Sequence, residues 1–184
     1  MSGDDTVTCY HECGHAVMAY LLGGRVEWLS LFGDEDCWKP HFGVCRVRWM
    51  HGRLLQSTAA SGLTSRWSED ADRSLRELAT LMAGPIAQRI YEGVGEDEAL
   101  RFVNEDGSGW SDDSFDDDLQ RAAGLATRLL GDASSVGLRR LVREVDRMFR
   151  DDRIWPAIAA LADELEAHES LGSDEVAETL DFWL

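Results

Sequence analysis

Basic residues are scarce in this 184-residue chain, which has 18 lysines and arginines against 35 aspartates and glutamates. The formal net charge of −17 repels nucleic-acid phosphates and anionic lipid head groups, so we expect no binding to nucleic acid or to a membrane surface. Apolar runs are short, and none reaches the roughly 18 residues that a membrane-spanning helix needs. Because residues 1–6 are polar and acidic, unlike a signal peptide, the sequence predicts a cytoplasmic protein without membrane insertion.

Cysteine is also rare, with four residues at positions 9, 13, 37 and 45. None of them forms the C-x-x-C pair of a thiolate zinc site, which argues against a zinc-finger-like module. Cys37 and Cys45 could face each other across a hairpin, but two free thiols are the favoured interpretation in a reducing cytoplasm. The chain has no G-x-x-x-x-G-K-[ST] motif either, so it carries no P-loop ATPase of its own.

The spacing of apolar residues predicts a mostly α-helical fold with a small β-hairpin or sheet. Helices are expected over residues 6–22, 68–91, 116–130, 135–150, 153–169 and 173–182. Strands are expected over residues 25–32 and 42–50, because in the second segment half-buried residues alternate with arginines at positions 46 and 48. The chain length suits one domain over 1–184, with a core and the hairpin in 1–130 and C-terminal helices in 131–184.

Several residues mark where these elements begin, bend or end. Asp5 or Thr6 is the expected N-cap of the first helix, and the glycines at 23 and 24 should stop it. The Gly84-Pro85 pair is expected to kink the second helix, because Pro85 cannot donate to the carbonyl four residues earlier. Ser173 is the expected N-cap of the last helix. Residues 51–67 and 94–115 are expected to be loops, and the second could cover the site described next.

The segment HECGH, residues 11–15, has the H-E-x-x-H pattern. On a helix, His11 and His15 lie one turn apart on the same face, so both rings can bind one Zn²⁺ ion at about 2 Å. Glu12 lies roughly 100° further around the helix, beside the metal without binding it. There it can take a proton from water and later pass it to the leaving amine. The apolar residues that follow indicate a core helix and not a surface helix that happens to carry two histidines.

A catalytic zinc site usually has a third protein ligand. Asp118 lies on the apolar, inward face of its helix, together with Ala122 and Leu125. A carboxylate on such a face is unfavourable unless a cation receives it, so we predict Asp118 as the third ligand. A helix-capping role suits Asp116 or Ser114 better. The other histidines follow no such pattern; they are His41, His51 and His168.

These residues resemble a known family. HECGHAVMAYLLGG is similar to the HEAGHA signature of the FtsH-type peptidase domain, the protease half of membrane-bound AAA proteases. Residues 75–93, LRELATLMAGPIAQRIYEG, resemble the helix of that family with the LLAGRAAEE-like run. Residues 117–127 resemble its NDLERAT segment, whose aspartate is the third zinc ligand, and this resemblance also selects Asp118. The likeness extends over about residues 6–180, although Cys13 replaces the usual alanine and Pro85 the usual arginine.

The resemblance implies a zinc-dependent metalloendopeptidase that cleaves unfolded or exposed segments. The edge strand over residues 42–49 would hold the substrate, unless that strand only packs on the helices. Without an ATPase module the domain would act independently of ATP, or with a separate AAA ATPase in trans. The relatives form hexamers, but the sequence does not choose between a monomer and an oligomer here. The alternative is a catalytically idle domain that binds peptides or a partner protein.

Overall fold

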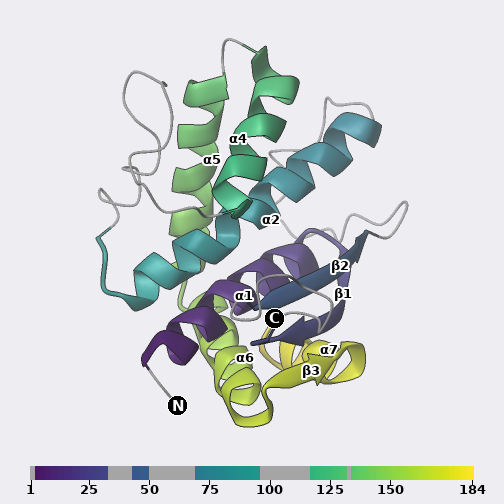
Figure 1. Cartoon of the computed structure of the whole chain (residues 1–184), viewed down its shortest axis with the longest axis vertical. Coiled ribbons are helices and arrows are strands. Elements are labelled where there is room, and N and C mark those ends of the chain that lie inside the picture. The colour runs from purple at the N-terminus through teal and green to yellow at the C-terminus, as the bar shows by residue number, and fades with distance from the viewer. Residues whose placement is uncertain (1–2, 33–42, 50–68, 96–116, 132–133) are drawn as a thin grey trace.

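Helices make up most of the structure, and three short strands form one small sheet (Figure 1). The computed structural model describes residues 3–32, 43–49, 69–95, 117–131 and 134–184. In chain order the elements are α1 (Gly3–Leu21), β1 (Gly24–Ser30), β2 (Val44–Trp49), α2 (Glu69–Tyr91), α4 (Asp117–Leu130), α5 (Ser134–Phe149), α6 (Ile154–His168), β3 (Ser170–Gly172) and α7 (Ser173–Trp183). The predicted fold class is therefore confirmed. None of the described helices is both long and apolar enough to span a membrane.

The helix that carries the HECGH segment, α1, lies at the centre of the fold. It packs against α2, α6 and the strands β1 and β2, while α4 and α5 lie toward one end of the molecule and α7 toward the other (Figure 1). Every residue from 12 to 19 is buried, so α1 is covered on all sides. A helix buried all round belongs to the core, as the apolar sequence after HECGH predicts.

The two ends of α1 were not equally predictable. The C-terminus falls where it was expected, and Gly23 follows with the positive φ of 80° that glycine adopts readily. The N-terminus differs, because the helix begins at Gly3 and the predicted caps Asp5 and Thr6 lie inside it. The Thr6 hydroxyl instead donates to Glu166 of α6 at 2.8 Å. A tertiary contact thus uses the side chain that local sequence suggests for capping.

The sheet has the strand order β2-β1-β3 with antiparallel pairing throughout. The predicted pair of strands is confirmed, and β2 lies at one edge of the sheet. The expected alternation in β2 is also present: Cys45, Val47 and Trp49 are half-buried, whereas Arg46 and Arg48 are exposed. The sequence pattern does not predict β3, because three residues are too few to show a period of two.

Helices α2 and α4 pack together and begin within one residue of the predicted positions. Pro85 lies inside α2, which continues to Tyr91; the kink at Pro85 stays a prediction. Gly93 follows the helix end with a φ of 80°, as expected for its stop. The packing of α2 against both α1 and α4 makes it the element that joins the histidine helix to the aspartate helix.

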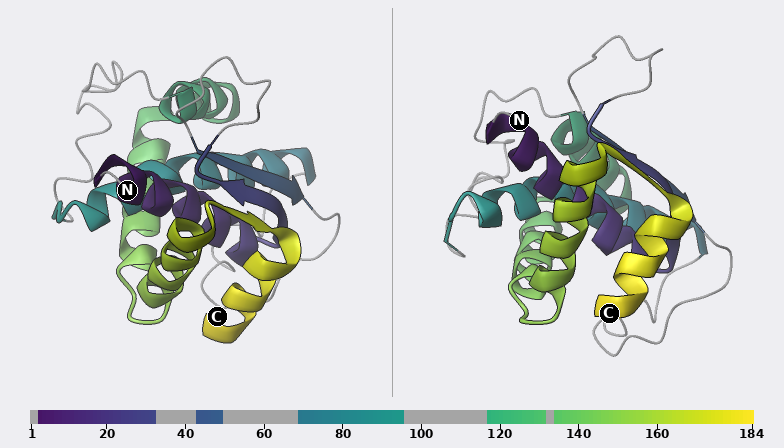
Figure 2. Two further views of the ribbon diagram at one scale, coloured as in Figure 1. Left: turned by 60° about the horizontal axis from the view of Figure 1, so that its bottom comes forward. Right: turned by 90° about the horizontal axis from the view of Figure 1, so that it is seen from below.

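The C-terminal helices α6 and α7 pack on α1 and β1, and Figure 2 shows α6 alongside α1. The expected cap at Ser173 is wrong by one residue: Gly172 is the N-cap, and Ser173 is the first residue of α7. The Glu175 carboxylate accepts the Gly172 N–H at 2.7 Å. The Ser173 hydroxyl accepts a hydrogen bond from Arg25 at 2.7 Å, which again gives a predicted capping side chain a tertiary partner.

Some predictions fall outside the described residues. These are the loop over residues 51–67, the part of 94–115 from residue 96 onward, the pairing of Cys37 with Cys45, and any role of His41 and His51.

Candidate metal centre

Three side chains from two distant segments meet at one point: His11 and His15 from α1, and Asp118 from α4. The Nε2 atoms of His11 and His15 lie 3.4 Å and 3.0 Å from the same Asp118 oxygen, Oδ2. Their ligand atoms all lie within 4.8 Å of one another, close enough to hold a metal ion. The structure therefore brings together the three residues that the sequence predicts as ligands, and their binding of a metal stays a prediction.

The far nitrogen of each imidazole is held by an oxygen atom from α2. The Nδ1 atom of His15 donates to the backbone carbonyl of Thr80 at 2.6 Å, and that of His11 donates to the amide oxygen of Gln88 at 3.2 Å. Gln88 in turn donates to Glu92 at 3.1 Å, which fixes the orientation of its amide. With Nδ1 donating, a neutral ring has its Nε2 lone pair available to a cation at the site, whereas a protonated ring donates from Nε2 to Asp118 instead.

Two glycines allow this close approach of α1 to α2. A Cβ atom on Gly84 would lie 2.3 Å from Nε2 of His15, and a Cβ atom on Gly14 would lie 2.6 Å from the backbone oxygen of Ala83. No larger residue fits at either position unless the helices or the imidazole move. Gly84 thus helps to set the position of the His15 ring.

The α2 residues that face the histidines are not among those predicted from the sequence. Thr80, Gly84 and Gln88 are four residues apart, so they form one stripe along α2. The sequence signal for this stripe is the recurrence of small and polar residues at every fourth position in the mostly apolar second half of α2. Gly84 was interpreted only as part of a kink with Pro85.

Asp118 lies in the first turn of α4, on the face predicted from the apolar pattern. Ala122 and Leu125, one and two turns later on that face, are buried. The Asp118 side chain itself is 23% exposed. Its second oxygen, Oδ1, lies 3.6 Å from the guanidinium group of Arg121, an ion pair within α4 that leaves Oδ2 facing the histidines.

The electrostatics of the three groups favour a positive charge between them. Burial alone would lower the pKa of His15, but the hydrogen bond and the charge of Asp118 outweigh burial and raise this pKa to about 9. Burial alone would raise the pKa of Asp118, but hydrogen bonds from His11 and His15 hold it well below its usual range. A proton or a metal cation can supply the charge that this arrangement favours.

The donor set fits a zinc ion. Two imidazole nitrogens and one carboxylate oxygen can serve as the three protein ligands of a catalytic zinc site, with a fourth position open to water. Ligands at about 2.0–2.1 Å in tetrahedral geometry lie roughly 3.3 Å apart. The nitrogen–oxygen distances of 3.0 Å and 3.4 Å agree with that spacing. Other divalent cations accept the same donors, so the geometry indicates a metal site without identifying the ion.

Glu12 lies beside the histidines and is only 6% exposed. Its carboxylate packs against the backbone just before β2, since a Cβ atom on Gly43 would lie 2.7 Å from its Oε1 atom. A cavity of about 410 Å³ is lined by Glu12 together with His15 and Asp118. The predicted general base therefore opens onto the same cavity as two of the predicted metal ligands.

The first half of the chain is similar to a known protein family. Residues 4–94 match the family model described as Peptidase M50B-like. The matched segment runs from α1 to the end of α2 and includes His11, Glu12 and His15, whereas Asp118 lies beyond it. The match supports a metallopeptidase-family domain, and hence a protease, but not the FtsH type in particular. No curated protein matches the chain closely enough to add to this finding.

The edge strand β2 forms one wall of the cavity of this peptidase-like domain. Four of its residues line the space: Val44, Cys45, Val47 and Trp49. Thr80 and Leu81 of α2 and Arg121 of α4 also line it. The cavity therefore extends from the candidate metal centre along β2. Among the described residues, β2 pairs with another strand, β1, on one side only.

Other residues considered from the sequence lie elsewhere. His168 lies in the last turn of α6, where its exposed ring is 3.5 Å from Glu164. Cys13 is fully buried in the core, and burial raises the pKa of its thiol well above the usual value. Trp49 lines the cavity, whereas Trp28 does not.

Proposed function

We propose that this protein is a zinc-dependent metalloendopeptidase that cleaves unfolded or exposed peptide segments. The observation that carries the proposal is the convergence of the two Nε2 atoms on one oxygen of Asp118, 3.4 Å and 3.0 Å away. The hydrogen bonds at both Nδ1 atoms support it, because they direct the lone pairs of His11 and His15 into the site. The family match over residues 4–94 supports it independently.

In this proposal His11, His15 and Asp118 hold the zinc ion. When bound, zinc would polarise the carbonyl group of the substrate and make water more acidic. The Nδ1 hydrogen bonds to Gln88 and to the Thr80 carbonyl keep the rings oriented. The Arg121 guanidinium group near Oδ1 helps to keep Oδ2 of Asp118 facing the imidazoles.

Glu12 is the proposed general base and then general acid. Its carboxylate accepts a proton from the water molecule that attacks the peptide carbon, and it later gives that proton to the leaving amine. Its low exposure of 6% keeps the proton transfer away from bulk solvent. The backbone of Gly43 packs on its carboxylate and restricts its position.

The substrate is proposed to lie in an extended conformation beside β2. Peptides often bind as an added strand at a sheet edge, through main-chain hydrogen bonds. β2 is an edge strand of the β2-β1-β3 sheet, and four of its residues line the cavity next to Glu12. An unfolded or exposed segment can adopt that conformation, whereas a folded domain cannot enter a cavity of about 410 Å³.

The similarity of the HECGH helix and of the segment around Asp118 to the FtsH type extends this proposal. We propose one peptidase domain over residues 1–184 that cleaves peptides without ATP. There are two alternatives: the domain acts with a separate AAA ATPase in trans, or it binds peptides or a partner without catalysis. The following experiment distinguishes them.

The test is to measure zinc content and cleavage of unstructured peptides for the full chain and for Glu12→Gln. We expect about one zinc per chain in both proteins. We expect kcat to fall by about 10²- to 10⁴-fold in Glu12→Gln, because the amide cannot accept the proton. Glu178→Gln, the same change at an exposed position of α7, is the control and should cleave like the parent protein.

The other outcomes have different meanings. A zinc-loaded parent protein that leaves every peptide intact contradicts the peptidase proposal and favours the binding module. Cleavage that begins only when an AAA ATPase is added favours action in trans. An unchanged kcat in Glu12→Gln rejects Glu12 as the general base.

A further inference from the structure

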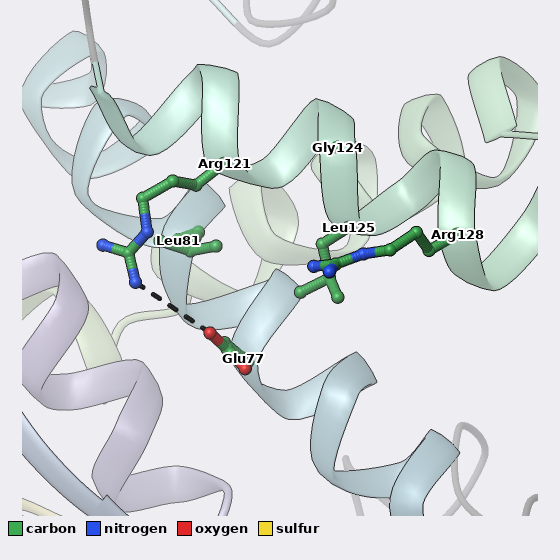
Figure 3. Close-up of a pocket in the computed structure, with 6 residues that line it drawn as sticks. All are labelled: Glu77, Leu81, Arg121, Gly124, Leu125 and Arg128. Carbon is green, nitrogen blue, oxygen red and sulfur yellow. Dashed lines mark ion pairs between the residues drawn. The ribbon is translucent and has the colours of Figure 1, made fainter.

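A second cavity, of about 420 Å³, lies between α2 and α4 (Figure 3). It is lined by Glu77 and Leu81 of α2 and by Arg121, Gly124, Leu125 and Arg128 of α4. Glu77, Leu81 and Arg121 also line the cavity at the metal centre. The two cavities therefore adjoin, and a peptide that passes the metal centre can extend into the second one.

The second cavity carries an unbalanced positive charge. Figure 3 shows the guanidinium groups of Arg121 and Arg128 on the side of α4 that faces α2. Arg121 lies 3.6 Å from Asp118 and 3.9 Å from Glu77, so its charge is largely balanced. Arg128 forms no ion pair with any described residue, although the chain has a net charge of −17 and many acids available.

A glycine in the middle of α4, Gly124, is exposed where it lines this cavity. Gly124 lines the cavity between the two arginines, and nothing lies within 4 Å of the position that its Cβ atom would take. Close packing therefore does not require glycine here, and glycine destabilises a helix interior relative to alanine. The absence of a side chain does leave room beside Arg128 for a ligand.

We propose that this cavity is a substrate subsite that binds a carboxylate of the peptide through Arg128. The proposal rests on the peptidase function proposed above and adds a specificity to it. The planar guanidinium group binds carboxylates with two parallel hydrogen bonds. Leu81 and Leu125 supply an apolar wall for the stem that bears the carboxylate. The carboxylate comes either from a glutamate or aspartate side chain or from the C-terminus of the substrate.

The overall charge of the protein makes this specificity easy to recognise. A net charge of −17 repels an acidic peptide at long range, so general electrostatics would favour neutral or basic substrates. A preference for an acidic residue at one position must therefore come from a local contact. Added salt should screen the repulsion and leave that contact in place.

The experiment uses unstructured peptides that differ only in one residue, glutamate or glutamine, placed in turn at each position of a neutral sequence with an amidated C-terminus. A third set carries glutamine and a free C-terminal carboxylate. For the full zinc-loaded chain, we expect kcat/KM to be about tenfold higher for glutamate at one position, or for the free C-terminus. The set of peptides that shows the preference identifies whether the carboxylate comes from a side chain or from the C-terminus.

Arg128→Gln should reduce this glutamate-to-glutamine ratio to about 1, and Arg128→Lys should keep part of it because the charge remains. Arg143→Gln is the matched control: Arg143 is an exposed arginine of α5 without an ion pair among the described residues, and it lines neither cavity. This control should keep the ratio. Cleavage without any preference, or with a preference that survives Arg128→Gln, overturns the subsite and leaves the peptidase proposal intact.

If no peptide is cleaved, the peptidase proposal fails. The subsite is then tested separately by measuring peptide binding. Fluorescence anisotropy then compares the Kd values of the same peptides for the zinc-loaded chain and for Arg128→Gln. Tighter binding of the acidic peptide that disappears in Arg128→Gln supports the subsite. Equal or undetectable binding of both peptides overturns it.

Discussion

The two sides of the candidate metal centre are held in place in different ways. On the histidine side, α1 and α2 approach closely at Gly14 and Gly84, and α2 holds the far nitrogen of each ring. On the aspartate side, Asp118 is more exposed than His15, at 23% against 8%, and its Oδ1 atom lies 3.6 Å from the exposed Arg121. Backbone packing therefore fixes the positions of the histidine rings, whereas the position of Asp118 depends more on its charge interactions.

This difference predicts two classes of variant. Changes on the histidine side should disturb both the packing of two helices and the metal ligands, because the same atoms serve both. Changes on the aspartate side should lower the affinity for the metal and leave the histidine rings in place. The predictions that follow test this distinction, beginning with the largest effect.

Gly84→Ala should have the largest effect. The added Cβ atom would lie 2.3 Å from Nε2 of His15, so the ring or the α2 backbone must move and the alignment of Nε2 with Asp118 is lost. We expect zinc affinity to fall by more than about 100-fold, which exceeds the usual effect of changing a residue behind a ligand. Overpacking should also lower the free energy of unfolding by about 1–3 kcal/mol. Competition with a chelator and urea unfolding measure the two effects, and parental zinc affinity would contradict this account of the histidine side.

Asp118→Asn should have the second-largest effect. The amide keeps the size of the side chain but loses the charge that attracts the cation, so we expect zinc affinity to fall by about 10- to 100-fold. The hydrogen bond from His15 to the Thr80 carbonyl should persist, because its 2.6 Å contact lies on the opposite side of the ring. NMR of the His15 Nδ1 proton checks this. Loss of that signal in Asp118→Asn would show that the two sides are not independent.

Gln88→Ala should have a smaller effect on the metal. It removes the oxygen that accepts from Nδ1 of His11 at 3.2 Å but keeps every ligand. We expect zinc affinity to fall by about tenfold, the lower end of the range for such residues. Gln120→Ala, the same change at an exposed position of α4, should leave zinc affinity unchanged. Equal affinities for the two variants would remove Gln88 from the site.

Gly124→Ala should have the smallest effect and is the matched comparison for Gly84→Ala. Nothing lies within 4 Å of the new Cβ atom, and alanine favours a helix interior over glycine by about 1 kcal/mol. We therefore expect a slightly higher free energy of unfolding in urea and an unchanged zinc affinity. A loss of zinc would mean that α4 does not tolerate even a methyl group and that Asp118 is held as rigidly as the histidines.

The parts of the site that sequence could predict are those with a local pattern. His11 and His15 share one helical turn, and Asp118 stands out because a carboxylate occupies the apolar face of its own helix. Gln88 lies on a stripe with Thr80 and Gly84, but this spacing does not identify its partner, because its role comes from a contact with His11, which lies 77 positions away. Gly84 was visible but ambiguous, since a glycine before a proline also suggests a kink.

The fold shows the same limit. Apolar periodicity predicts the long helices within one to three residues, because burial of one face over several turns repeats the signal. β3 has three residues and takes its partner, β1, from far away in the chain, so it shows no pattern of its own. The start of α1 was misplaced for a related reason, because Thr6 contacts Glu166 of α6 and does not cap a helix.

The packing of α6 on α1 affects how the chain folds during its synthesis. Tyr10 stacks on Trp155 with ring centroids 5.5 Å apart, and the Thr6 hydroxyl donates to Glu166, so the helix of the candidate metal ligands packs against a segment made much later. Ribosomes add about 5–20 residues per second, so the side of α1 that packs on α6 remains uncovered for roughly 7–30 s after His11 is added. During that time the nascent chain presents apolar surface beside two adjacent imidazoles. This apolar surface is open to aggregation until α6 emerges.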